Sequence, residues 1–142
     1  MRKKFSRIAL LIICCCIAFI ILLSDPTLAV TGGKTGVKIM EKEAVGQYLA
    51  DGNGVTLYRF TKDEKNISHC IEGCAANWPP FHADLSGVGD GLEAADFGVI
   101  TRTDNRQQTT YKDMPLYYFI NDKYPGDTFG DGIGDAWLLI TP

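Results

Sequence analysis

The sequence predicts an all-β, mainly antiparallel fold in which two tandem β-meander repeats pack into one small pseudo-two-fold sandwich or barrel-like domain. Two observations lead to this prediction. The same aromatic motif occurs twice, in residues 57–63 and 116–122, at an offset of 59 residues. Around each copy, short segments rich in β-forming residues alternate with turn residues, a pattern that is typical of β-hairpins.

The motif reads Leu-Tyr-x-Phe-x-x-Asp in both copies. Its aromatic and acidic members are Tyr58, Phe60 and Asp63 in the first copy, and Tyr117, Phe119 and Asp122 in the second. The two tryptophans of the chain, Trp78 and Trp137, keep the same offset. Upstream, Gly36-Val37 matches Gly98-Val99 at an offset of 62, which predicts three additional residues in the turns of the first copy. Such a fixed period indicates an internal duplication.

In the first repeat, residues 45–50 and 55–61 are expected to form strands. They flank Asp51-Gly52-Asn53-Gly54, which predicts a hairpin turn because Gly and Asn tolerate positive φ. Residues 70–77 have a weak helical pattern. We expect this repeat to span about residues 36–80.

In the second repeat, strands are expected at residues 97–102 and 107–111 around a turn, followed by 115–120 and 136–141. Pro115 cannot donate to a ladder, so it must open a strand or lie on an edge. Residues 92–97 have a weak helical pattern. Repeat 2 is then about residues 98–142, and the glycine-rich residues 81–97 are the connector.

Strand alternation places the Tyr and the Phe of each motif copy on one face of its strand. Together with Trp78 and Trp137 they are expected to form the centre of the core, because each aromatic ring buries roughly 150–250 Å². Asp63 and Asp122 follow the strand end, where a carboxylate can accept N–H groups of the next loop. The motif is therefore interpreted as core plus turn, and a binding site at these residues is the alternative.

Residues 1–29 are predicted to be a secretory signal peptide. Basic residues precede the apolar run 8–23, and Thr27-Leu28-Ala29 supplies small residues for cleavage after Ala29. The run is shorter than the roughly 20 residues that span a bilayer; an uncleaved anchor is the alternative. The mature residues 30–142 are expected to form a single exported domain, periplasmic or extracellular, without stable membrane insertion.

Removal of the signal segment takes away four of the 14 Lys and Arg but only one of the 17 Asp and Glu, which leaves a net charge of −6. An acidic chain without a cluster of Lys and Arg argues against nucleic-acid binding, because phosphate contacts require such residues. The sequence does not identify a partner, and an envelope protein is the kind of partner that we consider.

Cys70 and Cys74 are the cysteines of the mature chain and are expected to form a structural disulfide. An oxidising compartment favours the pair, and a spacing of four residues in one helical turn permits the separation of ~5.5–6 Å that a disulfide prefers. In the second copy Phe129 and Ile133 occupy the equivalent positions, where apolar packing is expected to replace the bridge.

A metal site is the alternative for this segment. His69, Cys70, Cys74 and His82 have ligand chemistry, and copper would suit such a mixed set. Their spacing matches neither a zinc signature nor a haem-attachment motif. Apart from this possible copper, no cofactor is expected.

Four aspartates of a glycine-rich loop suggest Ca²⁺, namely Asp122, Asp127, Asp131 and Asp135. They lack the alternate spacing and the closing Glu of an EF-hand, so solvated turn residues are expected instead. No Ser-His-Asp spacing or phosphate-binding loop occurs, and no catalytic residue is predicted.

The duplicated motif and the segment Ser68-x-Cys70-x-x-x-Cys74-Ala75-x-x-Trp78-Pro79-Pro80 resemble a family of exported bacterial proteins. These are known as secreted repeats or predicted lipoproteins with a Tyr-x-aromatic-x-x-Asp motif. The resemblance covers the whole mature chain and implies no settled activity. The chain departs from the lipoprotein members because its Cys14, Cys15 and Cys16 lie within the apolar run and cannot accept a lipid.

The sequence thus predicts an exported, non-catalytic envelope or extracellular module that binds or organises another molecule. The alternative is a periplasmic redox or copper-handling protein that uses Cys70, Cys74 and His69.

Overall fold

The computed structural model describes residues 36–142, so the predicted signal peptide lies outside the described residues. The elements, in chain order, are β1 (Val37–Lys42), β2 (Gly46–Asp51), β3 (Tyr58–Phe60), α2 (Gly73–Asn77), η1 (Leu85–Gly87), η2 (Ala94–Asp96), β4 (Phe97–Thr101), β5 (Gln107–Tyr111), β6 (Met114–Pro115), η3 (Ile133–Asp135) and β7 (Trp137–Leu139). Three small antiparallel sheets result: β1 with β2, β3 with β7, and β4–β5–β6. The all-β, antiparallel prediction is confirmed, and within the described residues no sheet closes into a barrel.

Each repeat begins with a hairpin. Strand β1 pairs with β2 starting at Val37 opposite Asp51, and β4 pairs with β5 starting at Phe97 opposite Tyr111. Val37 therefore corresponds to Phe97, at an offset of 60. The expected match of Gly36-Val37 with residues 98–99 is wrong. It rested on the identity of two residues in sequence, whereas the correspondence between strands is set by which residues pair across each hairpin. The first repeat carries one extra residue, in the turn that follows β2.

The two predicted strands that contain the motif are shorter than expected. In residues 55–61 only β3 is a strand, and Ala50 opposite Thr56 is a single bridge before it. In residues 115–120 only Pro115, in the edge strand β6, belongs to a strand, and Tyr117 forms isolated bridges. The reason is that the chain leaves its own hairpin at this point and pairs with the other repeat.

The two repeats join at the motif tyrosines. The Tyr58 N–H donates to the Tyr117 carbonyl at 2.9 Å, and the Tyr117 N–H donates to the Tyr58 carbonyl at 3.0 Å. A pair of residues that exchange both bonds is the central unit of an antiparallel ladder. Because the two residues are equivalent in the repeats, this exchange marks a pseudo-two-fold axis between them.

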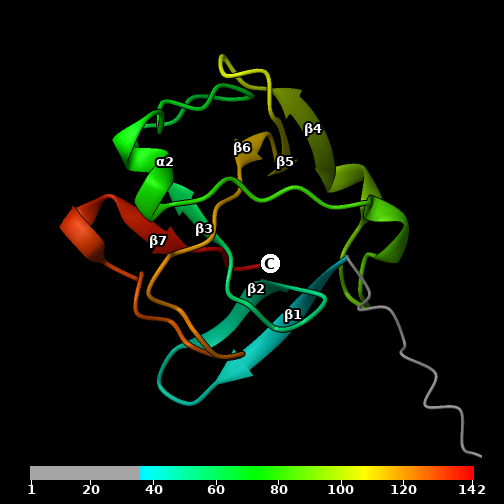
Figure 1. Cartoon of the computed structure of the whole chain (residues 1–142). Coiled ribbons are helices and arrows are strands. Elements are labelled where there is room, and N and C mark those ends of the chain that lie inside the picture. Colours follow the sequence, from blue (N-terminus) through cyan, green and yellow to red (C-terminus); the bar gives the residue numbers. More distant parts are fainter. Residues whose placement is uncertain (1–35) are drawn as a thin grey trace, which may run out of the picture. The chain divides into compact units, whose positions relative to one another are not determined.

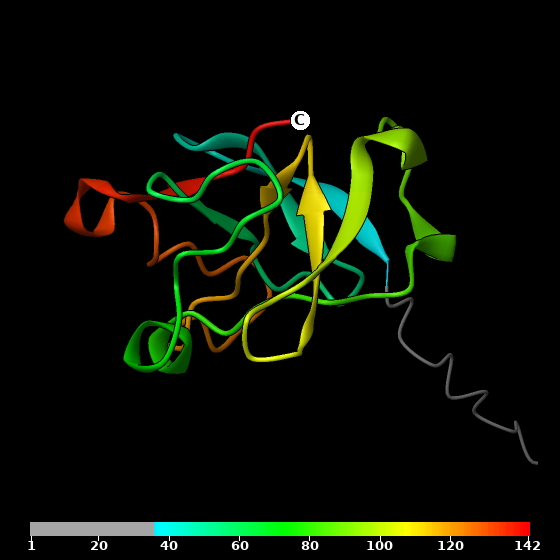
Figure 2. The ribbon, with the colours of Figure 1, turned by 90° about the horizontal axis from the view of Figure 1, so that it is seen from above.

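The second strand of each hairpin also forms a backbone hydrogen bond with the C-terminal segment of the other repeat. The Leu49 N–H in β2 donates to the Ile140 carbonyl, and the Thr109 N–H in β5 donates to the Phe81 carbonyl. Figure 1 shows the result, with the β1–β2 hairpin on one side of the β3–β7 pair and the β4–β5 hairpin on the other. Seen from above, helix α2 and the turns of the connector (residues 85–96) lie at opposite ends (Figure 2).

The motif Phe residues and the tryptophans form one continuous stack of four rings. Trp78 and Trp137 lie at its centre, with ring centroids 3.8 Å apart and planes 3° apart. Phe60 stacks on Trp137 at 4.4 Å, and Phe119 stacks on Trp78 at 4.3 Å. Each Phe thus packs on the Trp of the other repeat. Neither repeat alone contains the whole stack, so the core is shared between them.

A second apolar cluster lies between the hairpins. Its buried members include Leu57, Phe81, Leu116 and Ile140, and Tyr118 packs against it from a partly buried position. Leu57 and Leu116 are the first residues of the two motif copies, so this cluster also contains equivalent residues from both repeats. None of the helices in residues 36–142 is long enough and apolar enough to cross a bilayer.

Candidate functional site

The Tyr and Asp of the motif bond to each other across the two repeats. Tyr58 Oη donates to Asp122 Oδ2 at 2.6 Å, and Tyr117 Oη donates to Asp63 Oδ2 at 2.7 Å. The other carboxylate oxygen of each Asp accepts a backbone N–H of its own loop, from His69 for Asp63 and from Phe129 for Asp122. Each Asp therefore ties its own loop to the tyrosine of the other repeat.

Burial changes the ionisation of these groups. It raises the pKa of Asp63 above its ordinary value, and the bonds from the His69 N–H and from Tyr117 oppose part of that rise. Burial likewise raises the pKa of Asp122. Burial and the adjacent carboxylate raise the pKa of both tyrosines, so both phenols are neutral donors at pH 7. Every one of these polar groups has a partner within the fold, which favours a structural role.

In each repeat, a cationic side chain of the hairpin that begins the repeat donates hydrogen bonds to a loop of the other repeat. Arg102, which is buried, donates from Nη2 to the Cys70 carbonyl at 2.6 Å and from Nη1 to Gln108 Oε1 at 2.6 Å. Its equivalent in the first repeat, Lys42, is exposed and donates to Thr128 Oγ1 at 2.9 Å. A buried guanidinium that is bonded on several sides fixes the cysteine loop in place.

Cys70 and Cys74 form the predicted disulfide, with a Cα separation of 5.2 Å. The expectation that Phe129 and Ile133 replace it by apolar packing is wrong, because their side chains are 67% and 39% exposed. The N–H that bonds to the motif Asp comes from His69, six residues after Asp63, in the first repeat, but from Phe129, seven residues after Asp122, in the second. Because of this extra residue, the buried Gly130 is the structural counterpart of Cys70. A Cβ on Gly130 would lie 2.8 Å from the Tyr58 ring, which leaves no room for a side chain there.

The predicted copper ligands do not form a site in the described residues. Cys70 and Cys74 are bonded to each other and offer no thiolate, and His69 Nε2 lies 3.3 Å from Glu64 Oε1. Residues 36–142 contain no group of three or more His, Cys, Asp or Glu side chains that could hold a metal ion. His82 is exposed and does not join the other three in such a group.

The acidic loop uses its carboxylates for its own turns. Asp127 Oδ2 accepts the N–H groups of Lys123 and Tyr124, and Asp131 Oδ1 accepts the N–H of Leu139. Such bonds are the usual role of Asp in loops. These aspartates are therefore turn residues, and their bonds to N–H groups explain their positions without a cation.

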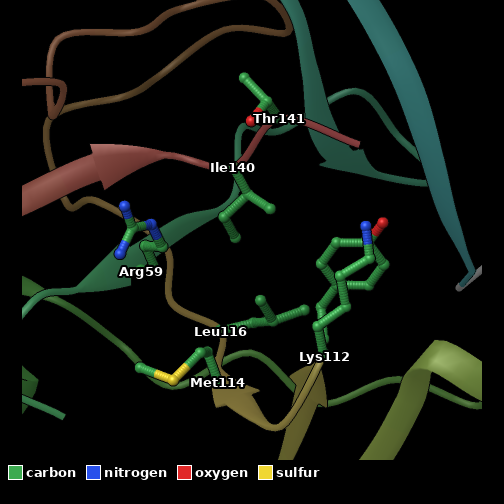
Figure 3. Close-up of a pocket in the computed structure, with 7 residues that line it drawn as sticks. Arg59, Lys112, Met114, Leu116, Ile140 and Thr141 are labelled. Atoms are coloured by element: carbon green, nitrogen blue, oxygen red, sulfur yellow. The ribbon is translucent and has the colours of Figure 1, made fainter.

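A pocket of about 210 Å³ lies where the hairpin turn after β5 faces β3 and the C-terminal segment. Its lining residues are Arg59, Tyr111, Lys112, Met114, Leu116, Ile140 and Thr141. We refer to it as the Arg59–Lys112 pocket. In Figure 3, Arg59 and Lys112 lie on opposite sides of the opening, and the apolar side chains of Leu116 and Ile140 lie between them.

The pocket is positively charged at its rim and apolar at its base. Leu116 and Ile140 are buried, whereas Arg59 is partly exposed and Lys112 is exposed. The Lys112 ammonium donates a hydrogen bond to the Tyr111 hydroxyl oxygen, which raises the pKa of Lys112 and keeps it a cation at neutral pH. Its ammonium also lies 4.8 Å from the centroid of the Tyr111 ring. Such a surface can bind an anionic group and cover an apolar one.

The backbone at Lys112 is unusual. Lys112 (φ 48°) and Asp113 (φ 68°) both have positive φ in the two-residue turn between β5 and β6. Such turns favour Asn and Gly, because other side chains are strained there. The neighbouring Asp113 carboxylate is bonded to Lys65 at 3.3 Å. This acidic group therefore has a cation of its own.

A second pocket, of about 370 Å³, lies between β1 and residues 86–90 of the connector. Lys38 and Asp90 are its charged residues, and most of the others are glycines or small residues. It has charges of both signs and no deep apolar base. The Arg59–Lys112 pocket has the more specific chemistry.

The sequence did not identify Arg59, Lys112 or Met114 as site residues. A signal for Arg59 was available in the motif itself, because the position between the Tyr and the Phe is Arg59 in one copy and Tyr118 in the other. No local signal marks Lys112, since its position in the pocket depends on the turn and on the approach of the C-terminal segment.

No curated protein and no solved structure matches the chain. A family model described as a secreted repeat of unknown function matches residues 40–82 and again residues 98–141, and these two ranges cover more than half of the chain. The two matches coincide with the two halves that the reciprocal Tyr58–Tyr117 bonds relate. The chain therefore belongs to the family of secreted repeats of unknown function.

Proposed function

We propose that this exported protein is a non-catalytic binding module, and that its ligand is a small molecule, or the end of a larger one, with an acidic group and an apolar body. The observation that carries the proposal is the Arg59–Lys112 pocket, in which two cations flank a buried apolar base. Small-molecule sites commonly combine an apolar lining with a few polar groups that orient the ligand.

The rest of the motif supports this choice of site. The motif carboxylates and phenols bond to one another, and the tryptophans are buried in the stack. These residues have no free group for a ligand. Arg59 is the motif position whose charged side chain lines the pocket.

Binding of hexanoate and hexylamine, measured by titration calorimetry, tests the proposal. The two probes share an apolar chain and carry opposite charges. We expect hexanoate to bind weakly and hexylamine not to bind, because the rim is cationic. Arg59→Gln and Lys112→Gln should each weaken hexanoate binding about tenfold, equivalent to ~1.4 kcal/mol. Lys62→Gln changes an exposed lysine outside the pocket and should have no effect. Equal binding of the two probes would contradict the proposal.

The proposal places the mature protein outside the cytoplasm, in the periplasm or the extracellular medium. Cleavage after Ala29 should give a protein that begins at Val30, which N-terminal sequencing of exported material would detect. Recovery of a protein that begins at Met1 from a membrane fraction would favour an anchor instead.

Thiol redox chemistry or copper handling at Cys70 and Cys74 is the alternative function. Free-thiol titration and metal analysis of the purified protein distinguish the two. We expect no free thiol, no bound copper, and a folded Cys70→Ser/Cys74→Ser variant with a lower melting temperature, since a five-residue loop contributes only ~2 kcal/mol on the chain-entropy model. Stoichiometric copper that is lost in this variant would support the alternative.

A further inference from the structure

We propose that the ligand of the Arg59–Lys112 pocket is an aromatic carboxylate: a planar six-membered ring with a carboxylate at its tip. This inference rests on the proposed function and adds the class of ligand. It is drawn from a comparison of the two halves of the molecule, one of which carries an aromatic ring at the position where the other has the pocket.

The pseudo-two-fold relation gives each pocket residue a counterpart. Arg59 corresponds to Tyr118, since each lies between the Tyr and the Phe of its motif copy, and both pair with equivalent strand segments: Arg59 opposite Leu138, and Tyr118 bonded through its N–H to the Pro79 carbonyl. In the same way Ile140 corresponds to Phe81, Leu116 to Leu57, and Tyr111 to Asp51. The strand register and the hydrogen bonds between the repeats give these correspondences.

In the other half, the tyrosine ring fills the counterpart site. The Tyr118 ring packs edge-on against Phe81, with centroids 5.4 Å apart and an interplanar angle of 87°. Its Oη donates to Asp51 Oδ2 at 2.9 Å. This half therefore shows what the common backbone accommodates at that position: one six-membered ring over an apolar base, with a polar tip that meets the residue at the end of the hairpin strand.

The pocket half has its aromatic ring at another position, because Tyr111 stands where the other half has Asp51. Arg59 replaces the tyrosine, and the smaller Ile140 replaces Phe81, so a volume of about 210 Å³ stays open. An apolar cavity of ~150 Å³ is enough to hold benzene. The opening therefore accommodates one ring with a small substituent.

The residues that face the tip of the ring differ in polarity between the halves: an acceptor in the filled half and donors in the pocket half. In the filled half, Asp51 accepts a hydrogen bond from the phenol. In the pocket half, that place holds the Tyr111 hydroxyl and the Lys112 ammonium, and Arg59 is a second cation on the opposite side of the opening. A ring in this half must therefore carry an acceptor at its tip, and a carboxylate binds the Lys112 ammonium there more strongly than a neutral acceptor does. A phenol or an amine would not.

The test measures binding of benzoate, cyclohexanecarboxylate, hexanoate and benzamide to the purified full protein by calorimetry or ligand-observed NMR. We expect benzoate to bind in the millimolar range that such small ligands reach, at least about fivefold more tightly than hexanoate or cyclohexanecarboxylate. Benzamide, which lacks the charge, should bind more weakly still. Arg59→Tyr restores the ring of the filled half and should abolish benzoate binding without lowering the melting temperature.

The controls separate the class of ligand from the site itself. Met114→Phe narrows the opening from a partly exposed position and should also block benzoate, which covers the case in which Arg59→Tyr is unstable. Hexanoate binding as tight as that of benzoate, sensitive to Lys112→Gln, would refute the aromatic class and leave the binding function standing. No binding of any carboxylate would refute both. Unchanged benzoate binding in Arg59→Tyr would refute the comparison of the two halves.

Discussion

Removal of the Tyr117 hydroxyl, in Tyr117→Phe, should destabilise the protein strongly. Tyr117 Oη donates to Asp63 Oδ2 at 2.7 Å and lies 2.7 Å from Ser68 Oγ, and Asp63 is only 8% exposed. The substitution leaves a buried carboxylate without one of its donors. A hydrogen bond to a charged group contributes ~1.5–3 kcal/mol net and a neutral one ~1 kcal/mol. We therefore expect the free energy of unfolding to fall by about 3 kcal/mol.

The equivalent change in the first repeat, Tyr58→Phe, is the matched control. Tyr58 Oη makes the same bond to Asp122, but Asp122 is only partly buried. Water can replace the lost donor there, but the buried Gly130 N–H also loses Tyr58 Oη as its acceptor at 3.2 Å, so we expect a cost of about 2 kcal/mol. Each hydroxyl has one further partner, the Gly130 N–H for Tyr58 and the Ser68 hydroxyl for Tyr117, so the difference between the two variants reflects mainly the burial of the carboxylate.

The cost of Tyr117→Phe should also depend on pH. The pKa of Asp63 is raised in the folded protein above 3.8, so Asp63 contributes stability that is full below pH 3.8 and is lost as pH rises through the folded value. The Tyr117 bond opposes this rise of the pKa, and its removal raises the pKa further. The free-energy cost of the substitution is therefore largest at pH 7 and shrinks as pH falls toward 4.

Equilibrium urea unfolding, followed by tryptophan fluorescence at pH 7 and pH 4, measures these differences, because Trp78 and Trp137 lie in the shared stack. Equal costs for Tyr117→Phe and Tyr58→Phe at pH 7 would refute the burial argument. A cost of Tyr117→Phe that is the same at both pH values would refute the role of Asp63 ionisation.

Two further predictions concern the shared core. Phe119→Ala removes one end of the ring stack and should cost roughly 3–5 kcal/mol, with both halves unfolding in one transition by fluorescence and circular dichroism; two separate transitions would contradict a shared core. Gly130→Ala places a Cβ 2.8 Å from the Tyr58 ring and 2.9 Å from Trp78, and it should lower the free energy of unfolding by about 1–3 kcal/mol in thermal or urea unfolding. The control is Gly73→Ala at the start of α2, where a Cβ would have nothing within 4 Å, and it should be neutral or slightly stabilising. Equal effects of the two variants would show that the structure near Tyr58 can adjust to the added methyl group.

The sequence predicted the class of fold because its repeat is long and its aromatic pattern is regular. It did not predict β1 (Val37–Lys42), and it assigned the first hairpin to the turn at residues 51–54. The turn that closes the true first hairpin contains Ala44 at φ 65°, a conformation that no local pattern indicates for Ala. The turn residues 51–54 that follow β2 have the stronger pattern, so the prediction placed the first hairpin one strand later than it is.

The site was harder to predict than the fold. Motif tyrosines and aspartates lie 54 and 64 residues apart along the chain and meet only because the halves are related by an axis between Tyr58 and Tyr117. A pattern within one copy predicts that Asp63 caps its own loop, and it cannot predict that the second oxygen receives a phenol from the other copy. The pocket depends on tertiary structure in the same way.

In a duplicated fold, the positions at which the two halves differ are more informative about function than those at which they agree. Agreement, as at Tyr58 and Tyr117 or at Trp78 and Trp137, follows from the need of both halves to form one core. Most differences are compensated in place: Gly130 makes room for rings where the other half has a cysteine. The exchange of Tyr118 for Arg59 is compensated only in part: Tyr111 brings a ring where the other half has Asp51, yet a volume of about 210 Å³ stays open with a cation on either side. Open volume beside an apolar base lowers stability, and a bound ligand that fills the volume with a ring and brings a negative charge to the cations would recover it.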